Sequence, residues 1–465
     1  MMLLPDRGQR DELDRLVMNY SRHPFGRREF LQRALMLGLT FSSASALLVA
    51  CGDNTGSSSA SDHTVDVLNV WSGEEQASFR AVVEPFTSRT KIAVNLEVTR
   101  DLDSALTTSL KGNSPPDIAI LPNPGKLQQL ASQNNLIRLD TFLDMKQFRK
   151  DYARAWIELG SYKGGLYALL FKAANKATVW YNPQQFRALN ATIPHTWPEL
   201  IALSDSIASS NKYPWSMGVA SATTTGWPAS DWIAEIYLNQ FGPDMYDQWV
   251  AHKIPWTHKS LKQAFELFGQ IVGGKHYIAG APQTILNTDY REACFAPFST
   301  PPQAYMYYLG DFTAGFITSQ FPGAKAGVDF DFFPFPTLNP HYQGAITVGV
   351  DMVIAMKDTQ AVRELIKYLA TAQAQTIWVK RGGFTSLNKS LDLKAYPNAV
   401  ARASASMLVE ADTIKFGAGD LMPPLVQQAF WKGMLAFIED QKQLDTVLQQ
   451  IEDAAQQAYT ADNTS

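Results

Sequence analysis

The feature that most constrains the fold of this chain is an alternation of strand and helix patterns over residues 65–121. Residues 65–71 and 91–99 alternate apolar and polar side chains, as half-buried strands do, and each is followed by a helical pattern. A short apolar run at 117–121 follows a turn with two prolines. Strands that alternate with helices predict βαβ units and a mainly parallel sheet, so we expect an α/β fold.

Similar patterns continue towards the C-terminus. Residues 165–170, 178–182 and 346–356 have the character of strands, whereas 359–379 and 422–459 have the pattern of helices. The chain has 465 residues, 46% of them hydrophobic and 18% charged, which predicts a globular protein of two or more domains.

The first 50 residues differ from the rest of the chain. The segment GRREFL contains Arg27 and Arg28 and resembles the twin-arginine signal, which is read by a translocase that exports folded proteins. Residues 34–50 are apolar and uncharged, which fits the core of a signal peptide better than a spanning helix. We therefore predict a signal peptide over 1–50. The alternative is a buried N-terminal helix followed by a chance cysteine.

The sequence LVAC, which ends at Cys51, resembles the bacterial lipobox, in which the cysteine is acylated and becomes the new N-terminus. Residues 51–64 are small and polar, so we expect a flexible linker between the lipid and the folded body. These features predict an extracytoplasmic protein that a lipid anchors to the cell membrane. Cys294 is then the one remaining cysteine, and we expect it to be a small buried residue.

The composition and the motifs argue against several classes of function. The net charge of −4 argues against a nucleic-acid partner, which favours a basic face. The sequence has neither a Gly-x-Ser-x-Gly elbow nor a His-Glu-x-x-His motif, and its seven histidines lack ligand spacing. We therefore predict no catalytic residues, no metal site and no cofactor.

Aromatic and acidic side chains occur where the chain turns, and sugars need this combination. Aromatic rings stack on the apolar face of a sugar, and carboxylates bind its hydroxyls. Trp71 ends a predicted strand, Glu74, Arg100 and Asp101 each follow one, and ligands of open α/β sheets bind at that edge. Core packing for the tryptophan and a solvated helix start for the acids are the alternative interpretations.

Several ordered segments together resemble one family, the extracellular solute-binding protein family 1 of ABC importers, and within it the α-glucoside-binding branch. They are WSGE at 71–74, TRD at 99–101, PDIAILPNPG at 116–125, VWYN at 179–182, TGWPASDW at 225–232, DFDFFPFP at 329–336, GGFTSLNK at 382–389 and DLMP at 420–423. The resemblance covers essentially all of residues 65–455.

The resemblance implies a two-lobed, periplasmic-binding-protein-like (type II) fold with a cleft and hinge strands. It places the N-terminal lobe at 65–174 plus 344–390 and the C-terminal lobe at 175–343 plus 391–465. It also implies a monomeric, non-catalytic receptor that captures a carbohydrate, such as an α-glucoside oligosaccharide, and delivers it to ABC permease subunits. Its expected ligand-binding residues are Trp71, Glu74, Arg100, Asp101, Trp227, Asp231, Tyr305, Asp351 and Trp431.

Two departures from the branch pattern weaken the α-glucoside assignment relative to sugars in general. The chain has Gly349-Val350-Asp351 in place of Gly-Gly-Asp, and KFGAGD at 415–420 in place of Arg-Phe-Asp-Ala-Ser-Asp. The change from arginine to Lys415 removes a planar fork that can grip two hydroxyls.

Two alternatives remain at this point. A secreted glycoside hydrolase could use two of the acids Glu74, Asp101, Asp231 and Asp351. A binding protein for a non-sugar solute, such as glycerol phosphate, a polyamine or a peptide, would keep the same fold. A phosphate ligand needs a cluster of cationic residues, for which the sequence positions only Arg100.

Overall fold

The computed structural model describes residues 63–411 and 413–462. The predicted signal peptide, the predicted lipidation site at Cys51 and the predicted linker up to residue 62 lie outside these residues. Among the described helices, none is both long enough and apolar enough to cross a membrane.

The described residues contain a six-stranded mixed sheet whose main path runs β11-β10-β3-β1-β2, with β6 also paired to β10. Its strands are β1 (Thr64–Asn69), β2 (Ala93–Val98), β3 (Ile118–Leu121), β6 (Ala168–Asn175), β10 (Ala345–Ala355) and β11 (Thr413–Phe416). β1 is parallel to β2 and β3, as the sequence predicts. β10 runs antiparallel to β3 and β6 but parallel to β11, so the expectation of a mainly parallel sheet holds at both ends and fails where β10 meets β3 and β6.

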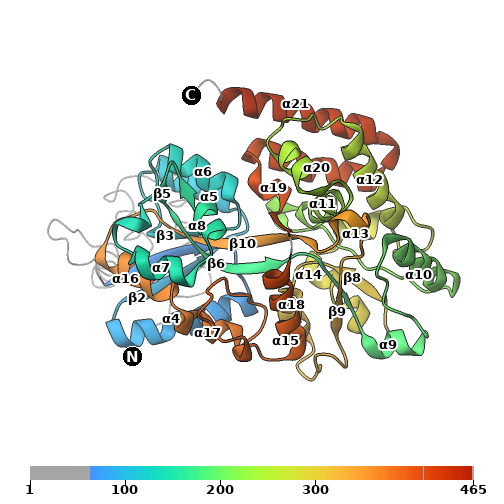
Figure 1. Cartoon of the computed structure of the whole chain (residues 1–465), viewed down its shortest axis with the longest axis horizontal. Helices are drawn as coiled ribbons and strands as arrows, with labels where there is room; N and C mark the ends of the chain where they lie inside the picture. The colour runs from blue at the N-terminus through green and yellow to red at the C-terminus, as the bar shows by residue number, and fades with distance from the viewer. Residues whose placement is uncertain (1–62, 412, 463–465) are drawn as a thin grey trace, which may run out of the picture. The chain divides into compact units, whose positions relative to one another are not determined.

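The long strands β6 and β10 connect two groups of elements, which we call the N-lobe and the C-lobe (Figure 1). The second half of β10 pairs with β3 in the N-lobe, and its first half pairs with β11. Because the two halves of β10 pair with different strands, β10 and its partner β6 together form the floor between the lobes. The predicted residue boundaries of the lobes stay a prediction.

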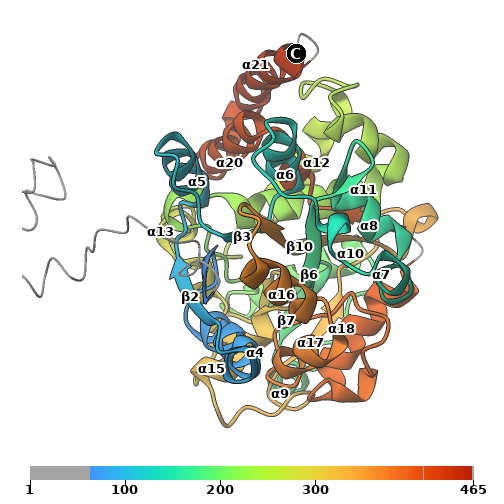
Figure 2. The same ribbon diagram turned by 90° about the vertical axis from the view of Figure 1, so that its left-hand side faces the viewer.

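The N-lobe surrounds the parallel end of the sheet, and Figure 2 faces it, with α5 and α6 above and α4 below. α16 packs on β1 and α17 packs on α4. A hairpin of β4 (Ser161–Tyr162) and β5 (Gly165–Leu166) lies in the same lobe. The helices of this lobe are α4 (Glu74–Thr90), α5 (Leu102–Lys111), α6 (Pro124–Ser132), α7 (Met145–Asp151), α8 (Arg154–Leu159), α16 (Gln360–Leu369) and α17 (Ala372–Val379).

The C-lobe is mainly helical around a small antiparallel sheet in the order β8-β7-β9. These strands are β7 (Thr178–Tyr181), β8 (Met306–Tyr308) and β9 (Asp331–Pro334). The helices are α9 (Pro183–Ala188), α10 (Trp197–Ser209), α11 (Trp227–Val250), α12 (Lys259–Val272), α13 (Gln283–Asn287), α14 (Tyr290–Ala293), α15 (Thr313–Gln320), α18 (Ala399–Glu410), α19 (Ala418–Leu421), α20 (Pro424–Glu439) and α21 (Leu444–Asp462).

Two long helices predicted from the sequence are each divided in the structure. The helix expected over 359–379 breaks before Thr371, whose side chain caps α17 by accepting a hydrogen bond from the Ala374 N–H. The pattern over 422–459 is interrupted at Asp440, which adopts an extended conformation between α20 and α21. Both breaks come from side chains that satisfy free backbone N–H groups at a new helix start, which apolar periodicity does not reveal.

Tryptophan and phenylalanine rings form the centre of the N-lobe core. Trp71 lies edge-on to Phe79 and Trp378, with ring centroids 5.0 and 4.8 Å apart, and the rings of Phe171 and Phe384 complete the cluster. Such edge-to-face contacts hold rings in fixed orientations. The loop after β1 is therefore anchored on a rigid base.

Candidate ligand-binding site

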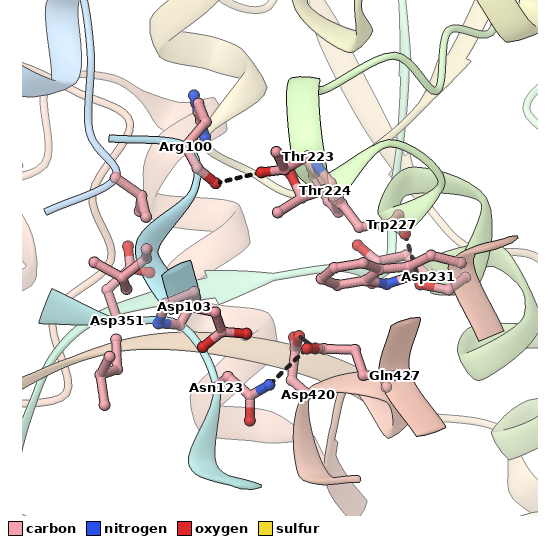
Figure 3. Close-up of a pocket in the computed structure, with 18 of the residues that line it drawn as sticks. Arg100, Asp103, Asn123, Thr223, Thr224, Trp227, Asp231, Asp351, Asp420 and Gln427 are labelled. Atoms are coloured by element: carbon pink, nitrogen blue, oxygen red, sulfur yellow. Dashed lines mark hydrogen bonds between the residues drawn. The ribbon is translucent and has the colours of Figure 1, made fainter. Parts of the chain in front are cut away.

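A cavity of about 430 Å³ lies between the two lobes (Figure 3). On the N-lobe side it is lined by the segments that follow β1, β2 and β3. The carboxyl ends of these parallel strands meet at one edge, where ligands of open α/β sheets bind. On the C-lobe side the lining comes from residues 223–225, the N-terminal end of α11, α19, the first half of α20, and residues at the starts of α14 and α15. The size is typical of a site for a small molecule.

The hinge strands form the floor of this cavity. Lys172, Ala174 and Lys176 line it from β6 and the residue after it, because alternate residues of an extended chain share one face. Gly349 and Asp351 line it from β10, and they pair in register with Ala174 and Lys172. The floor thus has a lysine at each end and two small residues between them.

The lysine at the N-lobe end is held by two carboxylates. The Lys172 ammonium donates a hydrogen bond to Glu75 Oε1 at 2.7 Å and lies 3.8 Å from Asp351 Oδ2. Only 3% of its side chain is exposed. Burial disfavours the charge of Lys172, but the attraction of Glu75 and Asp351 outweighs it and raises the lysine pKa. Asp351 also accepts a hydrogen bond from the Trp71 indole N–H at 2.7 Å.

Additional positive charge reaches this end from the C-lobe. Arg291 Nη2 lies 3.5 Å from Glu75 Oε2, and its Nη1 donates a hydrogen bond to Ser72 Oγ at 2.8 Å. Burial opposes the charge of Glu75, but Lys172, Arg291 and Arg100 together lower its pKa. Glu75 is therefore a carboxylate with several cationic neighbours.

The lysine at the C-lobe end is also held by two carboxylates but has no second cation beside it among the described ion pairs. Lys176 Nζ donates a hydrogen bond to Asp231 Oδ1 at 2.8 Å and lies 3.7 Å from Asp420 Oδ2. Burial opposes its charge, but Asp231 and Asp420 raise its pKa. Burial raises the pKa of Asp420 to about 7, and repulsion by Asp231 and Asp351 adds to the shift against the attraction of Lys176.

One acceptor at this end is incompletely satisfied. Asp231 Oδ2 also lies 2.8 Å from Lys176 Nζ, but without hydrogen-bond geometry, and it accepts no hydrogen bond from any described residue. The side chain of Asp231 is only 8% exposed. A buried carboxylate oxygen in this state is an acceptor available to a ligand hydroxyl.

Aromatic side chains border the same end of the cavity. Trp227, the first residue of α11, and Trp431, on α20, both line the cavity and are only partly buried. Figure 3 shows the Trp227 ring beside Asp231. The Lys176 ammonium lies 5.3 Å from the centroid of that ring. An indole face next to carboxylates suits the apolar face and the hydroxyls of a sugar ring.

Hydrogen bonds join the two lobes across the cavity. Thr223 Oγ1 donates to the backbone oxygen of Arg100 at 3.2 Å, and Arg100 Nη2 donates to the Tyr290 hydroxyl at 2.7 Å. On another side, Asn123 Nδ2 donates to Gln427 Oε1 at 2.8 Å (Figure 3). These contacts hold the lobes together around the cavity.

The structure brings seven of the nine residues predicted from the sequence to this cavity. They are Trp71, Arg100, Asp101, Trp227, Asp231, Asp351 and Trp431. Trp71 is only 1% exposed and belongs mainly to the N-lobe core. Asp101 serves as the N-cap of α5, where its side chain accepts a hydrogen bond from the Ser104 N–H. Its role therefore matches the alternative interpretation as a helix start.

The other two predicted residues do not line the cavity. Glu74 is exposed, and its nearest ion-pair partner is Arg381 at 4.0 Å. Its neighbour Glu75 takes the place expected for it, because successive residues of a helix point about 100° apart. Tyr305 is buried at the edge of the small sheet, where Lys212 Nζ lies 5.5 Å from its ring centroid.

Sequence reasoning also missed seven charged residues of the cavity lining, which are Glu75, Asp103, Lys126, Lys172, Lys176, Asp420 and Lys432. One signal was present: two lysines four residues apart in the run 168–177, where Asn175 is the other polar residue, must lie on one face of a strand. Such lysines need buried acids as partners. Lys415, where the sequence departs from the branch pattern, forms an ion pair with Asp247 and does not line the cavity.

No group of three or more His, Cys, Asp or Glu residues in the described part of the chain is arranged to hold a metal ion. Most of the charged groups of the cavity instead neutralise one another in pairs, and Arg100 and Lys432 line it without a carboxylate in the described ion pairs. Besides the two floor lysines, Lys126 Nζ lies 3.3 Å from Asp103 Oδ1. Such a cavity favours a polar ligand without net charge.

Comparison with known proteins identifies a family that matches this chain. The model of the family described as bacterial extracellular solute-binding protein matches residues 71–376. The chain is 33% identical over 375 residues to the osmoprotective compounds-binding protein GgtB of Synechocystis sp., an alignment that covers 80% of this chain and 88% of that protein.

A second relative and a solved structure resemble the chain over similar lengths. The α-glucosides-binding periplasmic protein AglE of Rhizobium meliloti is 32% identical over 394 residues, with 82% of this chain and 85% of AglE covered. The bacterial solute receptor AcbH, described as having an exclusive preference for β-D-galactopyranose, has a TM-score of 0.76 at 21% identity and covers 86% of this chain and 100% of its own. At that identity the likeness establishes the fold.

Proposed function

The chain belongs to the family of bacterial extracellular solute-binding proteins, and from this premise we propose that it captures a neutral carbohydrate and delivers it to the permease subunits of an ABC importer. The observation that carries the proposal is the end of the cavity where the partly buried Trp227 ring borders the unsatisfied Asp231 oxygen. The name of AglE, which includes α-glucosides, supports this class of ligand.

The charge balance of the cavity favours a sugar over glycerol phosphate. A phosphate group needs cations that are free to bind it. Lys172, Lys176 and Lys126 each have a carboxylate within 3.3 Å, whereas Arg100 donates a hydrogen bond to the Tyr290 hydroxyl and Lys432 has no carboxylate in the described ion pairs. A dianion bound to the three paired lysines would have to break their ion pairs, whereas a polyol can form hydrogen bonds to them as they stand.

We further propose that the cavity binds its ligand without chemical turnover, because the family and the relatives named above are binding proteins. The protein then acts as a monomeric receptor outside the cytoplasm, tethered through a lipid on Cys51 after twin-arginine export. Metabolic labelling with a radioactive fatty acid tests the tether. Wild-type protein should take up label and Cys51→Ala should not, and equal labelling of both would refute this part of the proposal.

Thermal unfolding in the presence of sugars tests the ligand class. The screen compares four sugars at about millimolar concentration: maltose, trehalose, sucrose and galactose. Glycerol 3-phosphate and spermidine, at the same concentration, represent the two rival classes of ligand. We expect saturable stabilisation by at least one sugar, which amounts to about 2.7 kcal/mol at a hundred times the dissociation constant. Saturation matters because concentrated sugars stabilise any protein through exclusion from its surface.

Two outcomes would contradict the proposal. The carbohydrate assignment fails if only glycerol 3-phosphate or spermidine gives a saturable shift, or if none of the sugars does. Chromatography of the sugars after incubation addresses turnover. The appearance of glucose from maltose, trehalose or sucrose would instead identify a hydrolase.

A further inference from the structure

The C-lobe end of the cavity has the composition of a site for an organic cation. Ammonium groups bind against the face of an indole ring, and carboxylates complete their coordination. Trp227 provides such a face, and Asp231 and Asp420 provide two carboxylates on different elements, α11 and α19. In this protein the cation is present already, because Lys176 Nζ lies 5.3 Å from the ring centroid and 2.8 Å from Asp231.

Two glycines leave the space through which this lysine enters. A Cβ atom at Gly349 would lie 2.9 Å from Lys176 Cε, which is closer than non-bonded carbons approach. A Cβ atom at Gly417 would lie 3.2 Å from Asp420 Oδ2 and 3.8 Å from Lys176 Nζ. Side chains at either position would therefore press on the lysine or on its partner. The path of the Lys176 side chain therefore requires Gly349, and Gly417 leaves room for its partner Asp420.

We propose that Lys176 is a specificity-determining residue: it occupies an ammonium site with the protein's own side chain, so that the cavity rejects cationic solutes and accepts neutral ones. The inference rests on the proposed use of this cavity as the ligand site. A second ammonium group near Lys176 would be repelled by it and would find its two carboxylates already engaged. A hydroxyl group meets no such repulsion and can bond to the free lone pairs of Asp231.

The N-lobe end of the cavity does not form an equivalent site for an ammonium group. Lys172 also lies between two carboxylates and near the rings of Phe312 and Trp378. There, however, Arg291 stands 3.5 Å from Glu75, so a cation remains beside the acids when the lysine is absent. At the C-lobe end, Lys176 is the cation that pairs with Asp231 and Asp420 in the ion pairs of the described residues.

Chemical rescue tests this inference without any sugar. Lys176→Ala removes three methylene groups and the ammonium, and n-propylammonium has the size and charge of the missing part. We expect propylammonium chloride to raise the melting temperature of Lys176→Ala in a saturable way. The dissociation constant measured by calorimetry should be at least tenfold lower for this variant than for the wild type. 1-Propanol and sodium chloride at equal concentration should give no such effect.

A matched variant controls for the loss of any buried lysine at the cavity. Lys126 is similarly buried and lines the cavity, but its ion-pair partner is the more exposed Asp103. Lys126→Ala should show no saturable response to propylammonium. The double variant Lys176→Ala/Asp231→Asn should also lose the response, because a neutral amide no longer attracts the cation.

Each result decides for or against the inference. Equal responses of Lys176→Ala, Lys126→Ala and the wild type would overturn it, as would equal rescue by 1-propanol. If Lys176→Ala does not fold alone, refolding in propylammonium replaces the melting experiment, and failure to recover soluble protein counts against the proposal. Failure of the sugar screen with successful rescue would refute the proposed carbohydrate function but leave the ammonium site established.

Discussion

The two ends of the cavity are built from the same parts and differ in their charge balance. Each has a buried lysine from the hinge segment 172–176 between two carboxylates. At the N-lobe end Arg291 adds a further cation, and Trp71 is locked in the core with its N–H on Asp351. At the C-lobe end no further cation accompanies Lys176 in the described ion pairs, and Trp227 keeps a partly free face.

This difference suggests a division of roles. Buried ion pairs that are fully surrounded add little to binding, but their loss is costly to folding. A partly exposed ring with an unsatisfied carboxylate is instead arranged for a ligand. We therefore expect the N-lobe end to support the fold and the C-lobe end to select the ligand. The predictions below test this contrast.

The largest contrast is expected between two tryptophan variants. Trp71→Ala should lower the free energy of unfolding by about 3–5 kcal/mol, because it removes a fully packed ring. Trp227→Ala should cost less, about 1–2 kcal/mol, because its partly buried ring borders the cavity while it contacts Tyr290 and Phe312, and it should abolish the sugar-dependent thermal shift. Urea unfolding and the sugar thermal shift measure the two effects, and a large loss of stability in Trp227→Ala would show that this ring belongs to the core.

The second test concerns the lysine of the N-lobe end. Lys172→Met should destabilise the protein by about 3 kcal/mol, because it leaves Glu75 and Asp351 buried with less compensation. The double variant Lys172→Met/Glu75→Gln should recover part of this loss. Lys415→Met is the control, because its partner Asp247 is 62% exposed and such pairs contribute at most about 1 kcal/mol. Equal effects of the two single variants would contradict the structural role of Lys172.

Sequence patterns predict only part of this site, because they report on local structure. The strands β1, β2 and β3 are predicted by alternation, and the residues after them line the cavity as expected. Alternation does not show which of two neighbouring acids faces inward, so Glu74 was expected where Glu75 lies. That choice depends on how α4 is rotated, which its packing against α17 determines.

Local sequence patterns could not predict the ion pairs on the floor of the cavity, for a different reason. Lys172 and its partner Glu75 are 97 residues apart in sequence, and Lys176 and Asp231 are 55 apart. A lysine in an apolar strand indicates that some acid must lie opposite it, but not which one. Tyr305 shows the limit of the family resemblance, which implied a ligand contact, because the Tyr305 side chain is buried outside the cavity lining and Lys212 Nζ lies over its ring.

The smallest expected effect is a difference in pH dependence between the two ends. The pKa of Asp420 is raised to about 7, so the folded protein binds a proton there that the unfolded chain releases above pH 4. Its contribution to stability is therefore complete below about pH 4 and is lost as the pH rises towards 7. Asp420→Asn should make the fall of unfolding free energy between pH 5 and 7 shallower, by up to about 1.4 kcal/mol per pH unit.

Glu75→Gln is the matched variant at the other end. The pKa of Glu75 is lowered, so its contribution is present above the ordinary glutamate pKa and is lost as the pH falls through its lower value in the folded state. Its replacement should leave the slope between pH 5 and 7 unchanged, and Glu235, whose pKa burial raises to about 7, should contribute the same slope in every variant. Urea unfolding at a series of pH values measures these slopes. If Glu75→Gln and Asp420→Asn changed the slope between pH 5 and 7 equally, the proposed difference in charge balance between the two ends would be wrong.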